Sequence, residues 1–279
     1  MAFHKRRTPA WRRIPLGYYV SLSVFSFFLM FPIFWIALSA FKKPIDVRQP
    51  TIFFEPTLNN FRIIFSDLYR FGDLLINSLI VCIAVVVISV PLAAMASYAL
   101  ARFRLRGKRW LLVGILSAQF FPAVVLVLPY FTLFRQLGML DTLESLVIIS
   151  LTHTLPFTIW LLKGFMETLP LEIEESAMVD GCSELGVFRH IVIPLARPGL
   201  LTAAIFAFIL TWNELLYALI LTSSRARTVT VGLVSVVGER DVPWEQMSAA
   251  GILVMVPILF MAFAIRHYFV GGLTAGAIK

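Results

Sequence analysis

The sequence predicts an all-α integral membrane protein with six transmembrane helices. Of its 279 residues, 59% are hydrophobic and only 14% are charged, and the mean hydropathy is +0.86. Soluble domains are about half apolar and about a quarter charged, so this composition indicates a bilayer environment. Six apolar stretches are also long enough to cross a membrane, which takes about 20 residues, and basic residues cluster at their ends.

Each predicted span follows from an apolar stretch of the chain. The first predicted span is too long for the apolar core of a cleavable signal peptide, and no small-residue cleavage site follows it. We therefore expect a retained helix that also directs insertion. The six spans are Leu16–Phe41, Leu74–Leu100, Trp110–Phe134 (interrupted by Pro122 and Pro129), Leu143–Leu162, Leu200–Leu221 and Ala249–Val270. They divide the chain into an N-terminal segment (1–13), a first helix with its connection (14–71), a five-helix core (72–267) and a C-terminal tail (268–279).

An even number of spans places both termini on one side of the membrane, and the distribution of Lys and Arg decides which side. With the termini inside, the cytoplasmic segments carry 15 of the 24 Lys and Arg residues and the outer segments carry 9. Both termini and the charged run between spans four and five are therefore expected in the cytoplasm. This placement accounts for the net charge of +8, so we expect contact with membrane lipid and no nucleic-acid binding.

The outer connection between spans one and two, from Lys42 to Asp73, is polar. Within it, Leu58, Phe61, Phe65 and Leu68 recur at helical spacing. This pattern favours a short amphipathic helix on the membrane surface, and a well-packed loop is the alternative.

A charged run from Glu167 to Gly199 separates two strongly apolar spans, and it predicts two short helices joined by a turn. Pro170 suits the first turn of the first helix, where its missing N–H has no cost. Gly181 is placed to adopt the left-handed conformation that ends this helix. Ser183 is expected to cap the second helix and Pro194 to end it. Such a hairpin, held between membrane segments, can be pushed by a soluble partner.

The sequence lacks the motifs of a catalytic or metal site. It contains no GxxxxGK[ST] loop, so the chain is not expected to hydrolyse nucleotide itself. Its four His residues form no nucleophile–base arrangement, and no Cys/His metal spacing is present. Cys82 lies in a span and Cys182 in the charged run, so no disulfide is expected. We therefore predict a transport subunit without catalytic or metal-binding residues, in which powered movement requires a separate ATPase.

Several polar side chains within the spans require an explanation, because a charge deep in a bilayer costs about 2.5–3.5 kcal/mol on insertion scales. Glu214 should therefore face the bundle interior, a water-filled cavity or a partner. Two alternatives stay open for the group: it either locks neighbouring helices together or lines a solute path. The candidates are Gln119, Asn213, Glu214, Tyr130 and Tyr217, with Phe120, Phe121 and Trp212 as further aromatic residues able to stack on sugar rings. Asn77 is expected to pack or cap helices, and His153 to be a satisfied hydrogen-bonding residue and not a proton relay.

The spacing within the charged run resembles the EAA loop of ABC importer permeases, whose pattern is EAA, three residues, Gly, nine residues and I-x-L-P. Here Glu175-Ser176-Ala177 is followed by Gly181 and then by Ile191-Val192-Ile193-Pro194, with Ser for Ala and Ile for Leu. The resemblance implies a cytoplasmic coupling helix–turn–helix that docks on an ATPase. The docking residues it implies are Glu175, Ser176, Ala177, Asp180, Gly181, Ile191 and Pro194.

Further segments resemble the carbohydrate branch of these permeases, the importers of the maltose and glycerol-phosphate type, in particular their smaller permease subunit. They are PTLNNFRIIF (56–65), NSL (77–79), ASYALARFRLRGKR (96–109), TWNELLYAL (211–219) and GGLTAGAIK (271–279). The resemblance implies a type I ABC importer permease fold with its core at 72–267, in the cytoplasmic membrane of a bacterium or archaeon. The implied partners are a homologous second permease, a dimer of cytoplasmic ATPase subunits that bind ATP and Mg, and an extracytoplasmic solute-binding protein. A permease for a non-sugar solute and a proton-coupled secondary carrier are the alternatives.

Overall fold

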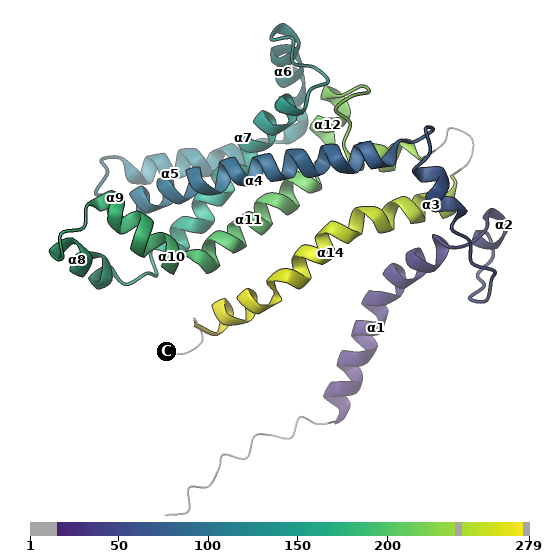
Figure 1. The fold of residues 1–279 in the computed structure, drawn as a ribbon, viewed down its shortest axis with the longest axis horizontal. Coiled ribbons are helices and arrows are strands. Elements are labelled where there is room, and N and C mark those ends of the chain that lie inside the picture. Colours follow the sequence, from purple (N-terminus) through teal and green to yellow (C-terminus); the bar gives the residue numbers. More distant parts are fainter. Residues whose placement is uncertain (1–15, 238–241, 276–279) are drawn as a thin grey trace, which may run out of the picture.

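The computed structural model describes residues 16–237 and 242–275, and it contains no strand in these ranges. Figure 1 shows an elongated arrangement in which α4, α7, α11 and α14 extend along the long axis, with α8 and α9 at one end and α2 and α3 at the other. The helices are α1 (Leu16–Ser39), α2 (Pro44–Val47), α3 (Asn59–Ile64), α4 (Phe71–Arg102), α5 (Lys108–Ser117), η1 (Ala118–Phe120), α6 (Ala123–Gln136), α7 (Leu143–Met166), α8 (Leu171–Val179), α9 (Glu184–Val187), η2 (Phe188–Val192), α10 (Ile193–Leu195), α11 (Arg197–Trp212), α12 (Leu216–Leu221), α13 (Val229–Ser235) and α14 (Trp244–Ala275).

The predicted all-α membrane fold is confirmed. Four helices in the described residues are long and apolar enough to cross a bilayer: α1, α4, α7 and α14. Two bent pairs raise the number of candidate spans to six, if each pair is counted as one span. The first pair joins Lys108–Phe120 to Ala123–Gln136 at 92°, and the second joins Glu184–Leu195 to Arg197–Trp212 at 75°.

The third span differs from the continuous helix that its hydropathy predicts. The chain leaves α5 through η1, breaks at Phe121-Pro122 and turns sharply into α6, which projects from the bundle (Figure 1). Proline has no N–H to continue the helix and disfavours the α conformation of the residue before it. Pro129, by contrast, lies inside α6 without ending it.

The fifth span also breaks, which the sequence pattern does not reveal. α11 ends at Trp212, and Asn213, Glu214 and Leu215 separate it from α12. Glu214 therefore does not lie within a continuous helix. No Pro or Gly occurs in this segment to signal the break.

The outer connection forms a shorter helix than predicted, with a different packed face. α3 covers only Asn59–Ile64, and Ile64 and Asn60 are its buried residues. Leu58, Phe65 and Leu68 are exposed, whereas Phe61 packs on the bundle, with its ring 5.2 Å from that of Phe41. The buried Asn60 amide explains the difference: it donates to the backbone carbonyls of Ala40 and Lys42 at 2.8 Å each, which fixes this face of α3 on the end of α1.

Two of the predicted segments lie at the ends of the chain. The N-terminal segment 1–13 lies outside the described residues. α14 continues to Ala275, so most of the predicted C-terminal tail is a continuation of the last helix, and 276–279 lie outside the described residues.

α4 is the central helix of the bundle and packs along both α7 and α11. At the end that carries α8 and α9, its small residues Ala93 and Ala94 share a buried cluster with Leu162 and Met166 of α7 and Ala203 of α11. Small residues allow helix backbones to approach closely, which is the usual basis of helix packing in membranes. α1 packs chiefly against α14 and is otherwise exposed, so its surface is available to lipid or to a partner.

A carboxylate joins two loops at the opposite end of the bundle. Asp141, between α6 and α7, accepts hydrogen bonds from four consecutive backbone N–H groups, those of Ser223, Ser224, Arg225 and Ala226, at 3.0–3.2 Å. Its own N–H donates to the carbonyl of Leu221, and its φ is +57°. Burial alone would raise the pKa of Asp141, but the N–H groups outweigh this effect and hold the pKa far below its ordinary value.

We predict that Asp141→Asn destabilises the protein, because a neutral amide binds the four N–H groups less strongly while still tolerating the left-handed backbone. The expected loss is roughly 1–2 kcal/mol, or a few degrees in Tm, measured by thermal unfolding in detergent. Since the pKa of Asp141 is lowered by folding, the difference from wild type should be constant at neutral pH and shrink as the pH falls below the ordinary value of about 4.

The exposed Asp67, which is in the outer connection, provides a matched control. Asp67→Asn should leave Tm unchanged. Equal effects of the two substitutions on Tm would contradict the stabilising role of the Asp141 carboxylate. A stability difference between wild type and Asp141→Asn that grows in acid would contradict it as well.

Candidate functional site

The charged run forms the predicted helical hairpin. α8 ends at Val179, Gly181 has φ +91°, and the Ser183 hydroxyl accepts the Gly186 N–H at 3.2 Å. The left-handed glycine and the cap of the second helix are thus confirmed. We call residues 170–195 the coupling hairpin.

Two prolines of the coupling hairpin differ from the prediction. Pro170 is the residue that precedes α8 and not a residue of its first turn. Pro194 does not end the second helix, which continues to Leu195 through a wider turn in which the Ile193 N–H reaches the carbonyl of Phe188. A widened turn accommodates the proline ring that an ordinary helix would exclude.

A buried ion pair fastens the coupling hairpin to α4. Glu174 on α8 is 3% exposed, and its Oε1 accepts from Nε and Nη2 of Arg102 at 2.8 and 2.6 Å. The Tyr98 hydroxyl donates to the other carboxylate oxygen at 3.1 Å. Arg102 Nη2 also donates to the carbonyl of Leu169, in the connection between α7 and α8, at 3.0 Å. Arg102 therefore holds α4, α8 and the end of α7 together.

The second helix of the coupling hairpin also packs against α4, beside the ion pair. The ring centroid of Phe188 lies 5.0 Å from that of Tyr98, and Val187 and Val192 are buried in the cluster formed by α4, α7 and α11. No local pattern in the sequence predicts this ion pair. The two are 72 positions apart, and only the fold brings them together.

The residues implied by the EAA pattern divide into two groups. Ala177 and Ile191 are half-buried and pack against the core. The exposed members are Glu175, Ser176, Asp180, Gly181 and Pro194. Beside them, Met178, Val179 and Leu185 are exposed apolar side chains around the turn, with Val179 at 87% and Leu185 at 75%. The free face of the hairpin is thus an apolar patch with an acidic edge.

A second candidate site is a cavity of about 610 Å³ between the α5–α6 bend, α7 and the break before α12. Four of the five polar candidates from the sequence line it: Gln119, Tyr130, Glu214 and Tyr217. Glu214 Oε1 accepts the Tyr217 N–H at 3.0 Å and so satisfies a free N–H in the first turn of α12. Glu214 therefore caps α12 and also borders the cavity.

The other span candidates have structural contacts. Asn213 is exposed, donates to the carbonyl of Ile209 at 2.8 Å and is not among the residues that line the cavity. The Trp212 indole is buried and donates to the carbonyl of Val254 at 3.2 Å. Phe120 and Phe121 are both exposed, and Phe121 borders the cavity.

His153, expected to be satisfied, has a buried Nε2 with no hydrogen-bond partner among the described residues.

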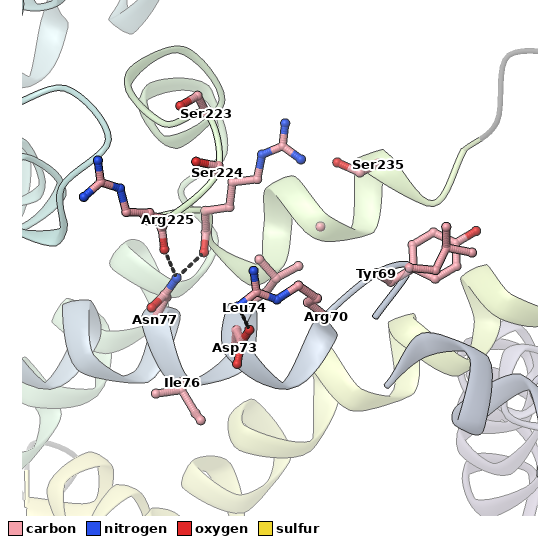
Figure 2. Close-up of a pocket in the computed structure, with 13 residues that line it drawn as sticks. Tyr69, Arg70, Asp73, Leu74, Ile76, Asn77, Ser223, Ser224, Arg225 and Ser235 are labelled. Atoms are coloured by element: carbon pink, nitrogen blue, oxygen red, sulfur yellow. Dashed lines mark hydrogen bonds and ion pairs between the residues drawn. The ribbon is translucent and has the colours of Figure 1, made fainter. Parts of the chain in front are cut away.

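A third hollow, of about 840 Å³, opens at the end of the bundle where α4 begins. Figure 2 shows Asn77 donating to the backbone carbonyl of Arg225, with Arg70 paired to Asp73 nearby. Asn77 also donates to the backbone carbonyl of Arg227 at 3.0 Å. Asn77 thus joins α4 to the loop after α12, as its predicted packing role requires. Arg70, Arg225 and Arg227 also line this hollow, which the sequence did not predict and which we call the outer groove after the predicted orientation of the chain.

Comparisons with known proteins place this geometry in a known context. Residues 89–274 match the profile of the family described as binding-protein-dependent transport system inner membrane component. The probable ABC transporter permease protein y4oR of Sinorhizobium fredii is 38% identical over 258 residues, covering 92% of each chain. The diacetylchitobiose uptake system permease protein DasC of Streptomyces coelicolor is 36% identical over 255 residues, covering 90% of this chain and 92% of the relative.

A solved structure has the same fold. It is the crystal structure of a bacterial ABC transporter that imports the acidic polysaccharide alginate, and one of its chains matches with a TM-score of 0.78 at 23% identity. The match covers 96% of this chain and 100% of that chain. The polar helical hairpin between apolar helices and the profile match over most of the chain lead to one conclusion: this protein belongs to the family of inner-membrane components of binding-protein-dependent ABC transport systems.

Proposed function

We propose that this chain is a permease subunit of an ATP-driven importer of a sugar or sugar-like solute. The observation that carries the proposal is the coupling hairpin, whose inner face is locked to α4 by Glu174 and Arg102 while its outer face is free. The sugar assignment is supported by the names of related proteins, one for diacetylchitobiose uptake and one for alginate import.

The free face of the hairpin suits a separate ATPase. Its exposed apolar residues, Met178, Val179 and Leu185, provide the desolvated centre that protein interfaces need, and Glu175 and Asp180 provide a polar rim. We expect a dimer of ATPase subunits in the cytoplasm to bind ATP and Mg and to dock one subunit here. Both termini would lie on the same side of the membrane.

The mechanism we propose is alternating access. ATP binding closes the ATPase dimer and displaces the coupling hairpin. Because Arg102 ties the hairpin to α4 and to the connection after α7, the displacement is transmitted to two spans together. The spans then open toward the outside to accept solute, and hydrolysis resets the inward-facing state.

Two further partners complete the proposed importer. A homologous second permease would cover exposed apolar surface such as that of α6, where Val124, Val125 and Leu128 lie in the open. An extracytoplasmic solute-binding protein would dock at the opposite end from the hairpin, where Arg225 and Arg227 border the outer groove.

Replacing Gly181 with valine should abolish coupling. The Gly181 φ of +91° is strained for a β-branched residue, although a Cβ would meet no atom within 4 Å. We expect at least a tenfold loss of ATP-dependent uptake in proteoliposomes and weaker retention of the ATPase on purification.

Gly138 is a matched control at the other end of the bundle, since it also has a positive φ of +66° and open space around it. Gly138→Val should cause similar strain but leave the ATPase bound. Normal uptake and assembly in Gly181→Val would refute the docking role of the hairpin.

The ion pair predicts a specific pattern of stability. Arg102→Met or Glu174→Leu alone leaves a buried charge without its partner, which costs about 3–5 kcal/mol in comparable cases. The double substitution removes both charges and should be less destabilising than either single one, measured by thermal unfolding of the purified complex. Additive losses in the double variant would show that the two side chains act independently.

A further inference from the structure

We infer that the cavity at the α5–α6 bend is a solute-binding half-site, and that it selects uncharged, hydroxyl-rich sugar units over anionic ones. The inference rests on the proposed importer function and adds the chemistry of the solute. It starts from the place where two broken helices meet. η1 and Phe121 interrupt one span, and Glu214 follows the break in another, yet both border the same cavity.

Helix breaks within a membrane have a restricted set of explanations. Backbone N–H and C=O groups released by a break must be satisfied, so irregular backbone at membrane depth occurs where it is buried in protein or lines a water-filled cavity. Gln119 is exposed beside one break, and Glu214 is only half-buried at the other. Polar groups facing lipid here would be costly, so the cavity is expected to hold water or solute. Its volume of about 610 Å³ lies in the range of small-molecule sites.

The polar groups that line the cavity make structural hydrogen bonds but keep donors or acceptors free for a solute. The Gln119 amide donates to the carbonyl of His153 at 2.6 Å, which leaves its oxygen for another partner. One oxygen of Glu214 is bound by the Tyr217 N–H, which leaves the other carboxylate oxygen without a hydrogen bond from the described residues. His153, whose buried Nε2 has no hydrogen-bond partner among the described residues, is also one of the residues that line the cavity.

Aromatic rings form one wall. Tyr130 and Tyr217 meet edge to face with centroids 5.8 Å apart, and the His153 ring stacks on Tyr217 at 6.2 Å. A sugar ring has hydroxyls around its edge and a C–H face, so it needs donors and acceptors beside a flat apolar surface. Amphipathic rings such as Tyr supply such a surface at a small loss of side-chain entropy.

The charge of the cavity determines which sugars fit. Among the described residues that line it there is a carboxyl group, Glu214, and no Lys or Arg. A carboxylate, sulfonate or phosphate on the solute would meet Glu214 without a compensating cation, and like charges brought together suppress binding of the wrong partner. Neutral sugars would instead offer hydroxyl donors to Glu214 and to the side-chain oxygen of Gln119.

The test measures binding to the permease itself, because a binding protein would select the solute first. We would record saturation-transfer NMR on the purified permease–ATPase complex without binding protein, using diacetylchitobiose as a neutral probe and an alginate disaccharide as an acidic one. Wild type should give clear transfer to the neutral probe and at least threefold less to the acidic probe. Equal transfer to both, or transfer to neither at tens of millimolar, would overturn the inference.

Two variants identify the residue responsible. Glu214→Gln keeps an oxygen for the Tyr217 N–H and removes the negative charge, so binding of the acidic probe should rise about fivefold, equivalent to about 1 kcal/mol. Gln119→Lys should raise it as well. Glu144→Gln, an equivalent change at an exposed position in the first turn of α7, is the control and should change nothing.

The outcome separates the half-site from the proposed function. Unchanged selectivity in Glu214→Gln and Gln119→Lys, together with ATP-dependent sugar uptake by the full importer, would refute the half-site alone. Absence of ATP-dependent uptake of any sugar by the full importer with its binding protein would refute the proposed function instead.

Discussion

The architecture depends on one buried ion pair at the end of the bundle that carries α8 and α9. Glu174 and Arg102 lie in a setting where neither charge could remain alone, with side-chain exposures of 3% and 14%. Such pairs add little net stability but specify one arrangement strongly, because separating them leaves an uncompensated charge. A coupling hairpin fastened in this way can transmit displacement only if it moves with α4. This restriction would allow a separate ATPase to move the membrane spans.

Departures from ideal helix geometry coincide with the proposed working parts. The bend of 92° between α5 and α6 and the break after Trp212 open a cavity in the bundle, and the widened turn before Pro194 shapes the second helix of the hairpin. Regular helices satisfy their own backbone groups. Breaks require local compensation, which Glu214 provides by capping α12.

The sequence predicts the fold well wherever local rules dominate. Hydropathy located the spans formed by α1, α4, α7 and α14. Turn chemistry placed Gly181 and Ser183 correctly, since φ preferences and caps act over a few residues. The prediction from sequence failed where contacts between residues far apart in the chain determine the structure. The Asn60 amide, not the apolar stripe, sets the face of α3, and the ion pair of Glu174 joins positions 72 residues apart. No Pro or Gly marks the break at Asn213, so the apolar pattern predicts a helix that continues through it. Glu214, a charged residue in an apolar stretch, was nevertheless a valid signal of a polar cavity.

Rigid coupling between the hairpin and α4 can be measured directly. Spin labels at Arg104→Cys and Arg189→Cys, both exposed positions, would report the distance between the end of α4 and the second hairpin helix, with Cys182 replaced by serine and Cys82 buried. Electron–electron double resonance on the full importer should give the same distance in the nucleotide-free and ATP-bound states, while the ATPase subunits close. A shift of several ångströms between the states would contradict the claim that hairpin and span move as one body.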